Sequence, residues 1–510
     1  MALGFGPERV AGVTPNGIST APPGSNVVVV GGGLAGLAAA ATLAERGVKV
    51  TVIEKAAYLG GRLGAWPTTL KTGETVVMER GFHAFFRQYY NLRRLMRKVD
   101  PSLKTLTPLE DYPLVGPDGD MESFDGLPRL PILNVAALVR RTQHLTIRDL
   151  LRVNVPQAME MLTYDPEETY RRHDHTSAAD YLDGLRFPAH GRQMLFDVFA
   201  HSFFNPEDEM SAAELLMMFH FYFTGNPEGL VFDVLNAPFT TVFLEPFARW
   251  LTALGVTIVT EQAVTDVTRD NGRFTVKTDA ASYEAGGVVL SVNVPALKTL
   301  FAASPTLNHP ILTPQVESLD VTLPFVVWRL WLDRPTRDGR APFVGTVAMD
   351  RLDNVSLFHL IEDESRDWAE AHGGSVMELH AYGVPAPFDT DELRAELWGH
   401  LMALYPELED AKVLDERYLE RQDCPAFSVG SDTLRPAPAT AVDGLTLAGD
   451  FVKLPFPSAL MERATASGVI AANHLLARLG VQGEPVFSVP SRGVVAKPWN
   501  ALRRFLPRAS

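Results

Sequence analysis

The chain has a single cysteine, Cys424, among its 510 residues. This excludes an internal disulfide and a cysteine-rich metal site, and it favours a reducing compartment. Basic residues are not in excess either, because 46 Lys and Arg stand against 61 Asp and Glu, for a net charge of −15. Nucleic acid is therefore not expected as a partner. No spacing of His, Asp and Glu is typical of a metal site, so no metal is expected.

A secretory signal and a fixed-period repeat are also missing. The first twenty residues contain no basic segment followed by an apolar core, so a cytoplasmic location is expected. The uncharged stretch Ala21–Ala44 is long enough to cross a membrane, but a glycine cluster interrupts it, which favours a strand followed by a helix. With 46% hydrophobic and 21% charged residues, the chain suits a globular protein of two or three lobes.

The most specific pattern lies between residues 27 and 62. Val27–Val30 predicts a buried strand, and Gly31, Gly33 and Gly36 follow it in a GxGxxG arrangement that opens a helix. Such glycines let a pyrophosphate approach the backbone at the N-terminus of the helix. Glu54 ends the next strand, at the distance expected of a carboxylate that binds an adenosine ribose. The pattern predicts a Rossmann-like α/β domain that binds a dinucleotide.

Gly60, Gly61 and Arg62 separate FAD from NAD as the expected cofactor. This second cluster resembles the extended FAD fingerprint of amine-oxidase-type and carotene-desaturase-type flavoproteins. The glycines permit close passage of the chain by the cofactor, and Arg62 supplies positive charge beside the phosphates.

The FAD domain is expected to be discontinuous. Its second piece contains a hairpin around Asn271-Gly272, and the order of its elements resembles the part of FAD-binding folds that contacts adenine through the backbone, here at Val264. Its third piece is a strand that ends in Gly449-Asp450 and a helix from about Ala459 to Leu476. Asp450 could bind the ribityl hydroxyls, and the helix N-terminus would face the flavin.

The predicted fold is thus an α/β FAD-binding domain of the amine-oxidase and carotenoid-desaturase type, with a mixed α+β substrate lobe. The expected organisation is a flexible arm (1–24), an FAD domain (25–100, 240–300 and 436–480), a substrate and possible membrane-contact lobe (101–239 and 301–435), and a basic amphipathic tail (481–510). The residues expected to hold FAD are Gly31, Gly33, Leu34, Ala35, Gly36, Glu54, Lys55, Gly61, Arg62, Val264, Gly449, Asp450 and Met461.

Several segments together resemble carotenoid desaturases of the plant and cyanobacterial type. They include the fingerprint, Gly81–His83 and Ala448–Gly468, although Arg463 stands where that family has Gly. Residues 81–94, Asp111–Leu114 and 201–206 narrow the match, because they look like the actinobacterial β-carotene desaturase/methylases, also called isorenieratene synthases.

That resemblance implies an FAD-dependent oxidoreductase that aromatises carotenoid β-rings. One methyl group moves to the neighbouring carbon, and each ring loses four hydrogens in two oxidations, which suits flavin chemistry. A linear carotenoid desaturase or isomerase, an amine oxidase, and a flavin-dependent carotenoid carrier are the alternatives. Oxygen, a quinone and a nicotinamide all stay open as the electron acceptor.

Four residues are candidates for orienting the substrate or accepting a proton. Glu79, Arg80 and His83 flank Gly81, in a segment that lies near the flavin according to the resemblance. Glu462 falls in the first turn of the flavin-facing helix, where stabilisation of that helix explains it equally well.

Three further stretches suit a carotenoid substrate that is stored in lipid. The aromatic run Met217–Phe223 could line a tunnel for a polyene or belong to the core. Leu127–Leu151 and the basic tail Lys497–Arg508 mix bulky apolar with basic residues, as interfacial helices do on anionic lipid. We therefore expect peripheral attachment to the inner face of the cell membrane.

Overall fold

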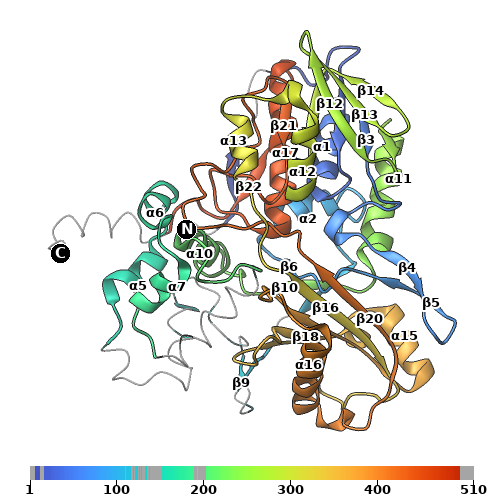
Figure 1. The fold of residues 1–510 in the computed structure, drawn as a ribbon, viewed down its shortest axis with the longest axis vertical. Helices are drawn as coiled ribbons and strands as arrows, with labels where there is room; N and C mark the ends of the chain where they lie inside the picture. The colour runs from blue at the N-terminus through green and yellow to red at the C-terminus, as the bar shows by residue number, and fades with distance from the viewer. Residues whose placement is uncertain are drawn as a thin grey trace.

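The computed structural model arranges the chain in three lobes around a common centre (Figure 1). The upper lobe in that view carries α17 and the β12–β14 sheet, the lower lobe carries β16 and α16, and a group of helices including α5 lies to one side. The structure describes residues 6–11, 17–109, 111–116, 119, 121–123, 126, 128, 133, 134, 137, 152–188, 192 and 203–493.

A five-stranded parallel sheet forms the centre of the upper lobe. Its order is β11 (Thr257–Val259), β3 (Lys49–Ile53), β2 (Asn26–Val30), β15 (Gly287–Leu290) and β21 (Leu445–Leu447). The four valines of β2 are all buried, as expected of a parallel strand covered on both faces. The sheet takes strands from all three predicted pieces of the FAD domain.

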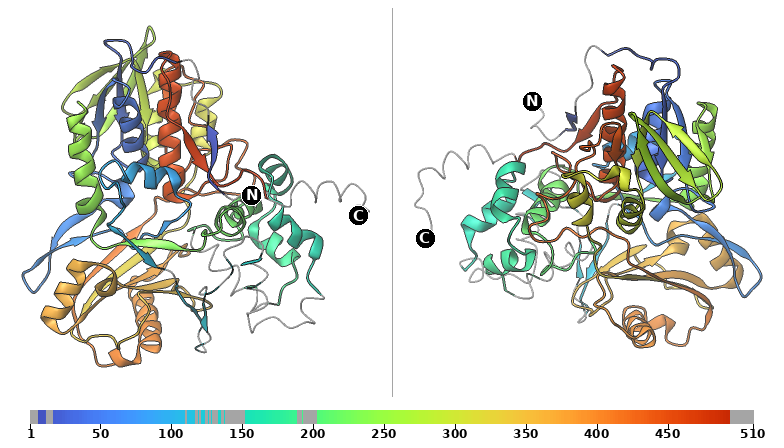
Figure 2. Two further views of the ribbon diagram at one scale, coloured as in Figure 1. Left: turned by 180° about the vertical axis from the view of Figure 1, so that it is seen from behind. Right: turned by 45° about the horizontal axis from the view of Figure 1, so that its top comes forward.

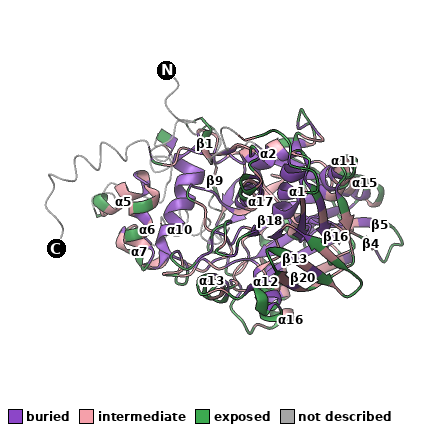
Figure 3. Cartoon of the chain, turned by 90° about the horizontal axis from the view of Figure 1, so that it is seen from above, coloured by how far each residue is buried: buried purple, intermediate pink, exposed green. Residues whose placement is uncertain are grey.

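Helices cover one face of this sheet. They are α1 (Leu34–Ala44), α17 (Leu460–Arg478) and α11 (Glu245–Ala253), and residues of all three belong to one buried core with Val27 and Val29. Every residue of α1 is buried, and this helix is drawn in the colour of buried residues in Figure 3. Gly468 of α17 lies so close to α1 that a Cβ there would be 2.0 Å from the Ala35 carbonyl oxygen.

The other face of the sheet packs against an antiparallel sheet and two helices. The three strands are β12 (Val264–Asp270), β13 (Arg273–Thr278) and β14 (Ser282–Ala285), and the helices are α12 (Val294–Ala303) and α13 (Leu312–Glu317). The predicted hairpin is confirmed in β12 and β13, where Asn271 and Gly272 both have positive φ. The third strand was not anticipated.

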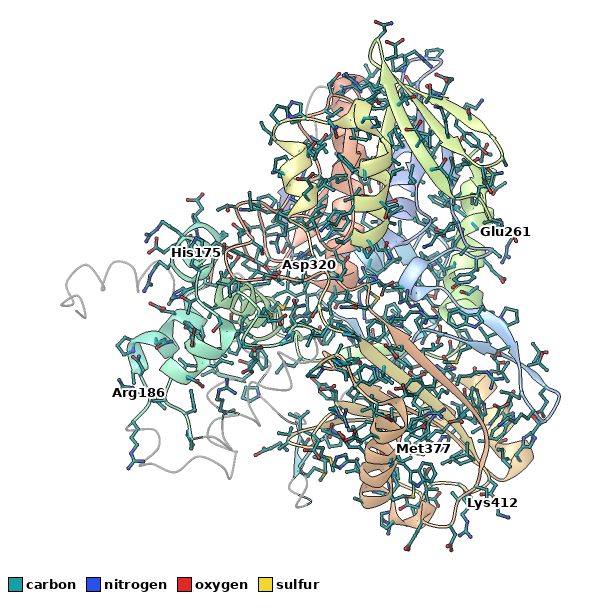
Figure 4. The ribbon with its side chains drawn as sticks, viewed as in Figure 1. His175, Arg186, Glu261, Asp320, Met377 and Lys412 are labelled. Atoms are coloured by element: carbon teal, nitrogen blue, oxygen red, sulfur yellow. The ribbon has the colours of Figure 1, made fainter. Side chains whose placement is uncertain are left out.

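The lower lobe is built on a seven-stranded sheet in which β16, β19 and β18 are buried along their whole length. From edge to edge it contains β20 (Val413–Arg421), β16 (Phe325–Leu332), β19 (Ser375–Ala381), β18 (Asn354–Leu357), β17 (Phe343–Thr346), β8 (Leu114–Val115) and β9 (Met121–Glu122). The helices α14 (Phe358–Ile361), α15 (Asp363–His372) and α16 (Thr390–Leu404) belong to the same lobe. Figure 4 labels Met377 on β19 and Lys412 immediately before β20.

The side lobe and the centre contain the remaining elements. Helices α5 (Val155–Leu162), α6 (Pro166–His173) and α7 (Ala178–Gly184) lie around α10 (Ala212–Phe219), which continues as a π-helical turn, His220–Thr224. Figure 2 shows this group beside the two larger lobes. The centre and its margins contain β6 (Phe85–Phe86), β10 (Phe232–Leu235) and β7 (Leu106–Leu109) in one sheet, the hairpin β4 (Trp66–Thr69) and β5 (Thr75–Met78), and helix α2 (Tyr90–Met96).

The expected arm and tail need correction. Glu8–Ala11 forms β1, which pairs with β22 (Val486–Ser488), so part of each predicted appendage completes one small sheet. The Glu484 carboxylate also forms ion pairs with Arg46 and Arg94. The sequence pattern missed this pairing because a two-stranded sheet between chain ends carries no local signal.

Both expected membrane contacts lie largely or wholly outside the described residues. Only isolated positions of Leu127–Leu151 are described, and Lys497–Arg508 is not described at all. Within the described part of the chain, no helix has the length and apolar character needed to span a bilayer.

The contact between α1 and α17 generates a stability prediction. Gly468→Ala places a methyl group against the Ala35 carbonyl, so the helices must separate, at a cost of about 1–3 kcal/mol. We expect a lower thermal unfolding midpoint and reduced flavin retention. Gly399→Ala is the matched control, since Gly399 is an exposed residue of α16 with no atom within 4 Å of a built Cβ. The control should leave stability equal or higher, because alanine favours helix; equal midpoints for the two variants would refute the prediction.

Candidate functional site

One cavity of about 530 Å³ runs from the glycine loop of the upper lobe to the sheet of the lower lobe. Its walls include the carboxyl ends of β2 and β3, the start of α17, and residues of β16 and β19. Ligands of open parallel sheets bind outside the carboxyl ends of the strands, which is the position of this cavity. Nearly all predicted cofactor residues lie in its wall.

The glycine loop has the geometry that a bound pyrophosphate requires. Gly31 has φ +105°, and a Cβ there would lie 2.7 Å from the Ser291 carbonyl oxygen. Gly33 immediately precedes α1 and lines the cavity, and no atom lies within 4 Å of a Cβ built there, so the backbone is open to a ligand. The first amides of α1, at Leu34 and Ala35, have no acceptor within the helix and face this space with the positive end of its dipole.

Glu54 secures the loop as well as lining the cavity. Its Oε2 accepts a hydrogen bond from the Gly32 amide at 2.7 Å, and its Oε1 accepts one from the Ala56 amide at 2.8 Å. Glu54 is 8% exposed, and the neighbouring Lys55 is an exposed residue that also lines the cavity. The backbone of the loop therefore holds the Glu54 carboxylate in place.

Arg62 and Asp450 meet at the middle of the cavity wall. An Arg62 Nη lies 2.5 Å from a carboxylate oxygen of Asp450, and the other Nη contacts the Cys424 sulfur at 3.6 Å. Burial raises the pKa of the Cys424 thiol to about 11, so the thiol is neutral at physiological pH. Sequence reasoning assigned Arg62 and Asp450 to different parts of the cofactor, and the structure places them in contact.

Gly61, Val264, Gly449 and Met461 complete the predicted set that lines the cavity. The prediction that Gly36 contacts the cofactor is wrong, because Gly36 does not line the cavity. A Cβ at Gly36 would lie 2.0 Å from the Gly31 carbonyl oxygen, so this glycine is needed for the turn between β2 and α1.

The end of the cavity near the lower lobe is aromatic. Tyr222 is the one residue of the run Met217–Phe223 in the wall, while Phe219, Phe221 and Phe223 pack in the core. The run is thus mainly core, with a single side chain at the site. The aromatic wall consists of Phe82, Phe86, Tyr112, Phe203, Phe204, Tyr222, Phe232, Phe325, Phe343 and Tyr382.

Two of the four predicted catalytic candidates line the cavity. Arg80 forms a bidentate ion pair with Asp423, in which its two Nη atoms donate to the two carboxylate oxygens at 2.8 and 3.0 Å. His83 lies nearby, and its pKa falls to about 4, mainly because burial disfavours the imidazolium. His83 is therefore neutral at physiological pH, and Arg80 provides a fixed positive charge in the wall.

The prediction that Glu79 and Glu462 act on the substrate is wrong, because neither side chain lines the cavity. The Glu462 carboxylate accepts hydrogen bonds from the Asn91 and Leu92 amides, which stabilises the first turn of α2. Burial raises its pKa to about 7 despite these bonds. Glu79 Oε1 accepts from the Phe239 amide at 2.9 Å. Sequence position on a cofactor-facing segment did not reveal which way each side chain points.

Arg463, the departure from the family pattern, is also buried and structural. Its guanidinium forms an ion pair with Glu214 of α10, and its Nε donates to the Ser458 carbonyl at 2.8 Å. Arg435 pairs with the same carboxylate at 3.3 Å. These two arginines outweigh the effect of burial and hold the pKa of Glu214 at about 2.

A possible metal site was not expected from the sequence. Among the described residues, one group, Asp350, Glu396 and His400, brings three potential ligand atoms within 4.8 Å of one another. It is partly exposed, and Arg351 already pairs with the Glu396 carboxylate. None of the three residues lines the cavity.

Sequence reasoning missed the polar residues that the lower lobe contributes to the wall. His380 and Tyr382, at the end of β19, and Asn354, at the start of β18, lie in the cavity wall beside His83. A signal existed, because Glu378, His380 and Tyr382 alternate along an otherwise apolar strand and so point to one face. Nothing in the sequence indicated that this face meets the flavin domain.

The chain is similar to known flavin-dependent oxidoreductases in both sequence and fold. Residues 34–476 match the family described as flavin containing amine oxidoreductase, and the chain belongs to it. A putrescine oxidase structure shares the fold, with a TM-score of 0.67 and 18% identity, covering 89% of this chain and 99% of that one. The chain is an FAD-dependent oxidoreductase.

Within this class, the chain is similar in sequence to two enzymes that modify carotenoids. A carotenoid phi-ring synthase from Streptomyces griseus is 45% identical over 92% of this chain and 90% of its own length. A carotenoid phi-ring synthase from Chlorobaculum tepidum is 27% identical, covering 92% and 91%. The chain belongs to the same family as the first, which confirms the resemblance to the actinobacterial carotenoid-modifying enzymes.

The open space at Gly33 generates a test of the cofactor site. Gly33→Val adds a branched side chain where the pyrophosphate needs bare backbone, while the glycine's φ of −76° suits valine. We expect a folded, colourless protein whose circular dichroism matches that of the wild-type apoprotein. Absorbance at the flavin bands after denaturation measures occupancy, and a yellow variant with full occupancy would contradict the assignment.

Proposed function

We propose that this oxidoreductase desaturates carotenoid β-rings and moves one ring methyl group, converting β-carotene to the aromatic isorenieratene. The observation that carries the proposal is the continuity of the cavity between the dinucleotide loop and the aromatic wall. The name of the Streptomyces griseus relative supports the same ring chemistry.

The apolar wall suits an end ring that has no hydrogen-bonding group. Phe82 stacks on Phe343 with ring centroids 4.6 Å apart, and Phe232 approaches both residues from the side. Such walls bind hydrocarbon by burial and exclude water from a cationic ring. When bound, FAD supplies the hydride acceptor for the two oxidations of each ring.

Arg80 is best suited to an electrostatic role. Its ion pair with Asp423 fixes the guanidinium in the wall, and it approaches the Phe325 ring at 6.0 Å. A fixed positive charge stabilises electron density on a reduced flavin, whereas it opposes a substrate cation in direct contact. The proposal therefore places Arg80 on the cofactor side of the site.

The function is tested by expressing the protein in a host that makes β-carotene. A mass spectrum of the pigments should show the loss of four or eight mass units, with the aromatic product absent from hosts that carry the empty vector or Gly33→Val. Losses in steps of two along an open chain would instead support a linear desaturase. Unchanged pigment together with peroxide release from a soluble amine would support an amine oxidase, and pigment that co-purifies unchanged would support a carrier.

We also propose peripheral attachment to the inner face of the cell membrane, supported by the sequence of Lys497–Arg508. Neutralising Arg503, Arg504 and Arg508 should weaken binding to anionic vesicles by about 1 kcal/mol per charge. Neutral vesicles should show little change. Flotation of vesicles with bound protein measures the difference, and equal flotation of the wild type and the variant would rule out the tail as the anchor.

A further inference from the structure

A chain of hydrogen bonds connects the cavity wall to a buried carboxylate in the lower lobe. The Tyr382 hydroxyl lies 2.6 Å from His380 Nδ1, and His380 Nε2 lies 2.7 Å from Glu378 Oε1. Tyr382 and His380 line the cavity, whereas Glu378 is fully buried behind them. All three side chains come from one face of β19 and its continuation.

Arg329 on the neighbouring strand β16 keeps Glu378 ionised. Its Nε donates to Glu378 Oε2 at 2.7 Å, and only 1% of the arginine is exposed. Burial alone raises the pKa of a carboxyl, but Arg329 and His380 outweigh it and hold the pKa of Glu378 at about 2. Two more carboxyls lie near Arg329, and burial raises the pKa of both Glu79 and Glu362, so they are poor competitors for its charge.

The carboxylate determines the proton positions in the chain. An ionised Glu378 can only accept, so His380 Nε2 carries the proton and donates it. In the neutral imidazole, His380 Nδ1 is then an acceptor, and the Tyr382 hydroxyl donates to it. Asn354 Nδ2 donates to the same hydroxyl oxygen at 3.1 Å, which fixes the phenol in the wall.

The segment that the sequence singled out supports this chain. Gly81 has φ +130°, and a Cβ there would lie 2.8 Å from His380 Cε1. The glycine therefore lets the backbone between Arg80 and Phe82 pass directly against the imidazole. The Phe82 amide N–H also points at His380 Nε2, at 3.4 Å, but the ionised Glu378 carboxylate at 2.7 Å is the closer partner of this nitrogen.

We propose that Tyr382 accepts the protons released when the ring is oxidised, and that His380 and Glu378 position and drive this transfer. This inference rests on the proposed function. Once the ring has lost a hydride, for which bound FAD would be the acceptor, a ring C–H bond breaks and its electron pair stays in the ring as a new double bond. The proton binds the Tyr382 oxygen while the hydroxyl proton moves to His380 Nδ1, and the imidazolium is paired with the Glu378 carboxylate. Water removes the proton when the product leaves.

The relay is tested with purified holoenzyme and β-carotene in detergent, without oxygen, with the enzyme in excess. Flavin bleaching reports hydride transfer, and quenching in methanol traps a ring cation as its methyl ether. Tyr382→Phe should bleach at nearly the wild-type rate, yet form desaturated product roughly 10²-fold more slowly and accumulate the ether. His380→Ala should behave similarly and regain product formation with added imidazole, which does not rescue Tyr382→Phe.

Tyr405→Phe is the matched control. Tyr405 is a buried tyrosine at the end of α16 in the same lobe, and its hydroxyl has no hydrogen-bond partner among the described residues. This variant should bleach and form product as the wild type does. Flavin content and thermal unfolding of all variants establish that the fold is kept.

Three outcomes would overturn the relay. They are wild-type product formation in Tyr382→Phe, loss of the step in His83→Gln but not in Tyr382→Phe, or no slowing of wild-type product formation in D2O. The D2O measurement needs no variant, so it can still contradict the relay if a substitution unfolds the protein. If the wild type itself leaves the mass of β-carotene unchanged, the proposed function fails, whereas normal aromatisation in the variants defeats only the relay.

Discussion

The close contact between α1 and α17 holds the cofactor half of the site together. Gly468 has no side chain to keep α17 away from the Ala35 carbonyl, so the first turns of both helices reach the same cavity. The two helices are more than four hundred residues apart in the sequence but share one buried core with β2. This contact brings Gly33 and Met461, from opposite ends of the chain, to the wall of one cavity.

A second constraint is the buried charge of Arg329 in the lower lobe. An unpaired guanidinium at this depth costs several kcal/mol, and Glu378 is the partner that removes most of this cost. The Arg329 guanidinium also lies 3.8 Å from the centre of the Phe358 ring. Because Glu378 must stay ionised for this purpose, His380 has a permanent acceptor, and structural stability and the proposed proton relay depend on the same ion pair.

The sequence predicted the elements whose backbone conformation is specified by a local residue pattern. The strand, glycine turn and helix over residues 26–44 were found because few sequences combine buried valines with that glycine spacing, and β15, β21 and α17 followed from similar local patterns. It failed for side-chain direction. Glu462 was placed in the correct turn, yet its carboxylate points to α2 and not to the cavity. His380 and Tyr382 were not predicted as site residues because the sequence of their strand is typical of a buried core strand.

The sequence by itself determined the cofactor class, the FAD-domain fold and a set of residues that nearly all line the cavity, since glycine conformation and strand burial are local properties of the chain. Only the tertiary structure decided which polar residues meet the substrate end of that cleft. Those residues come from β5, β18 and β19 and their flanking turns, and their partners are set by how the lower lobe packs on the FAD domain. The physical reason is that burial and hydrogen-bond partners depend on contacts between distant segments, whereas turns and strands depend on neighbouring residues.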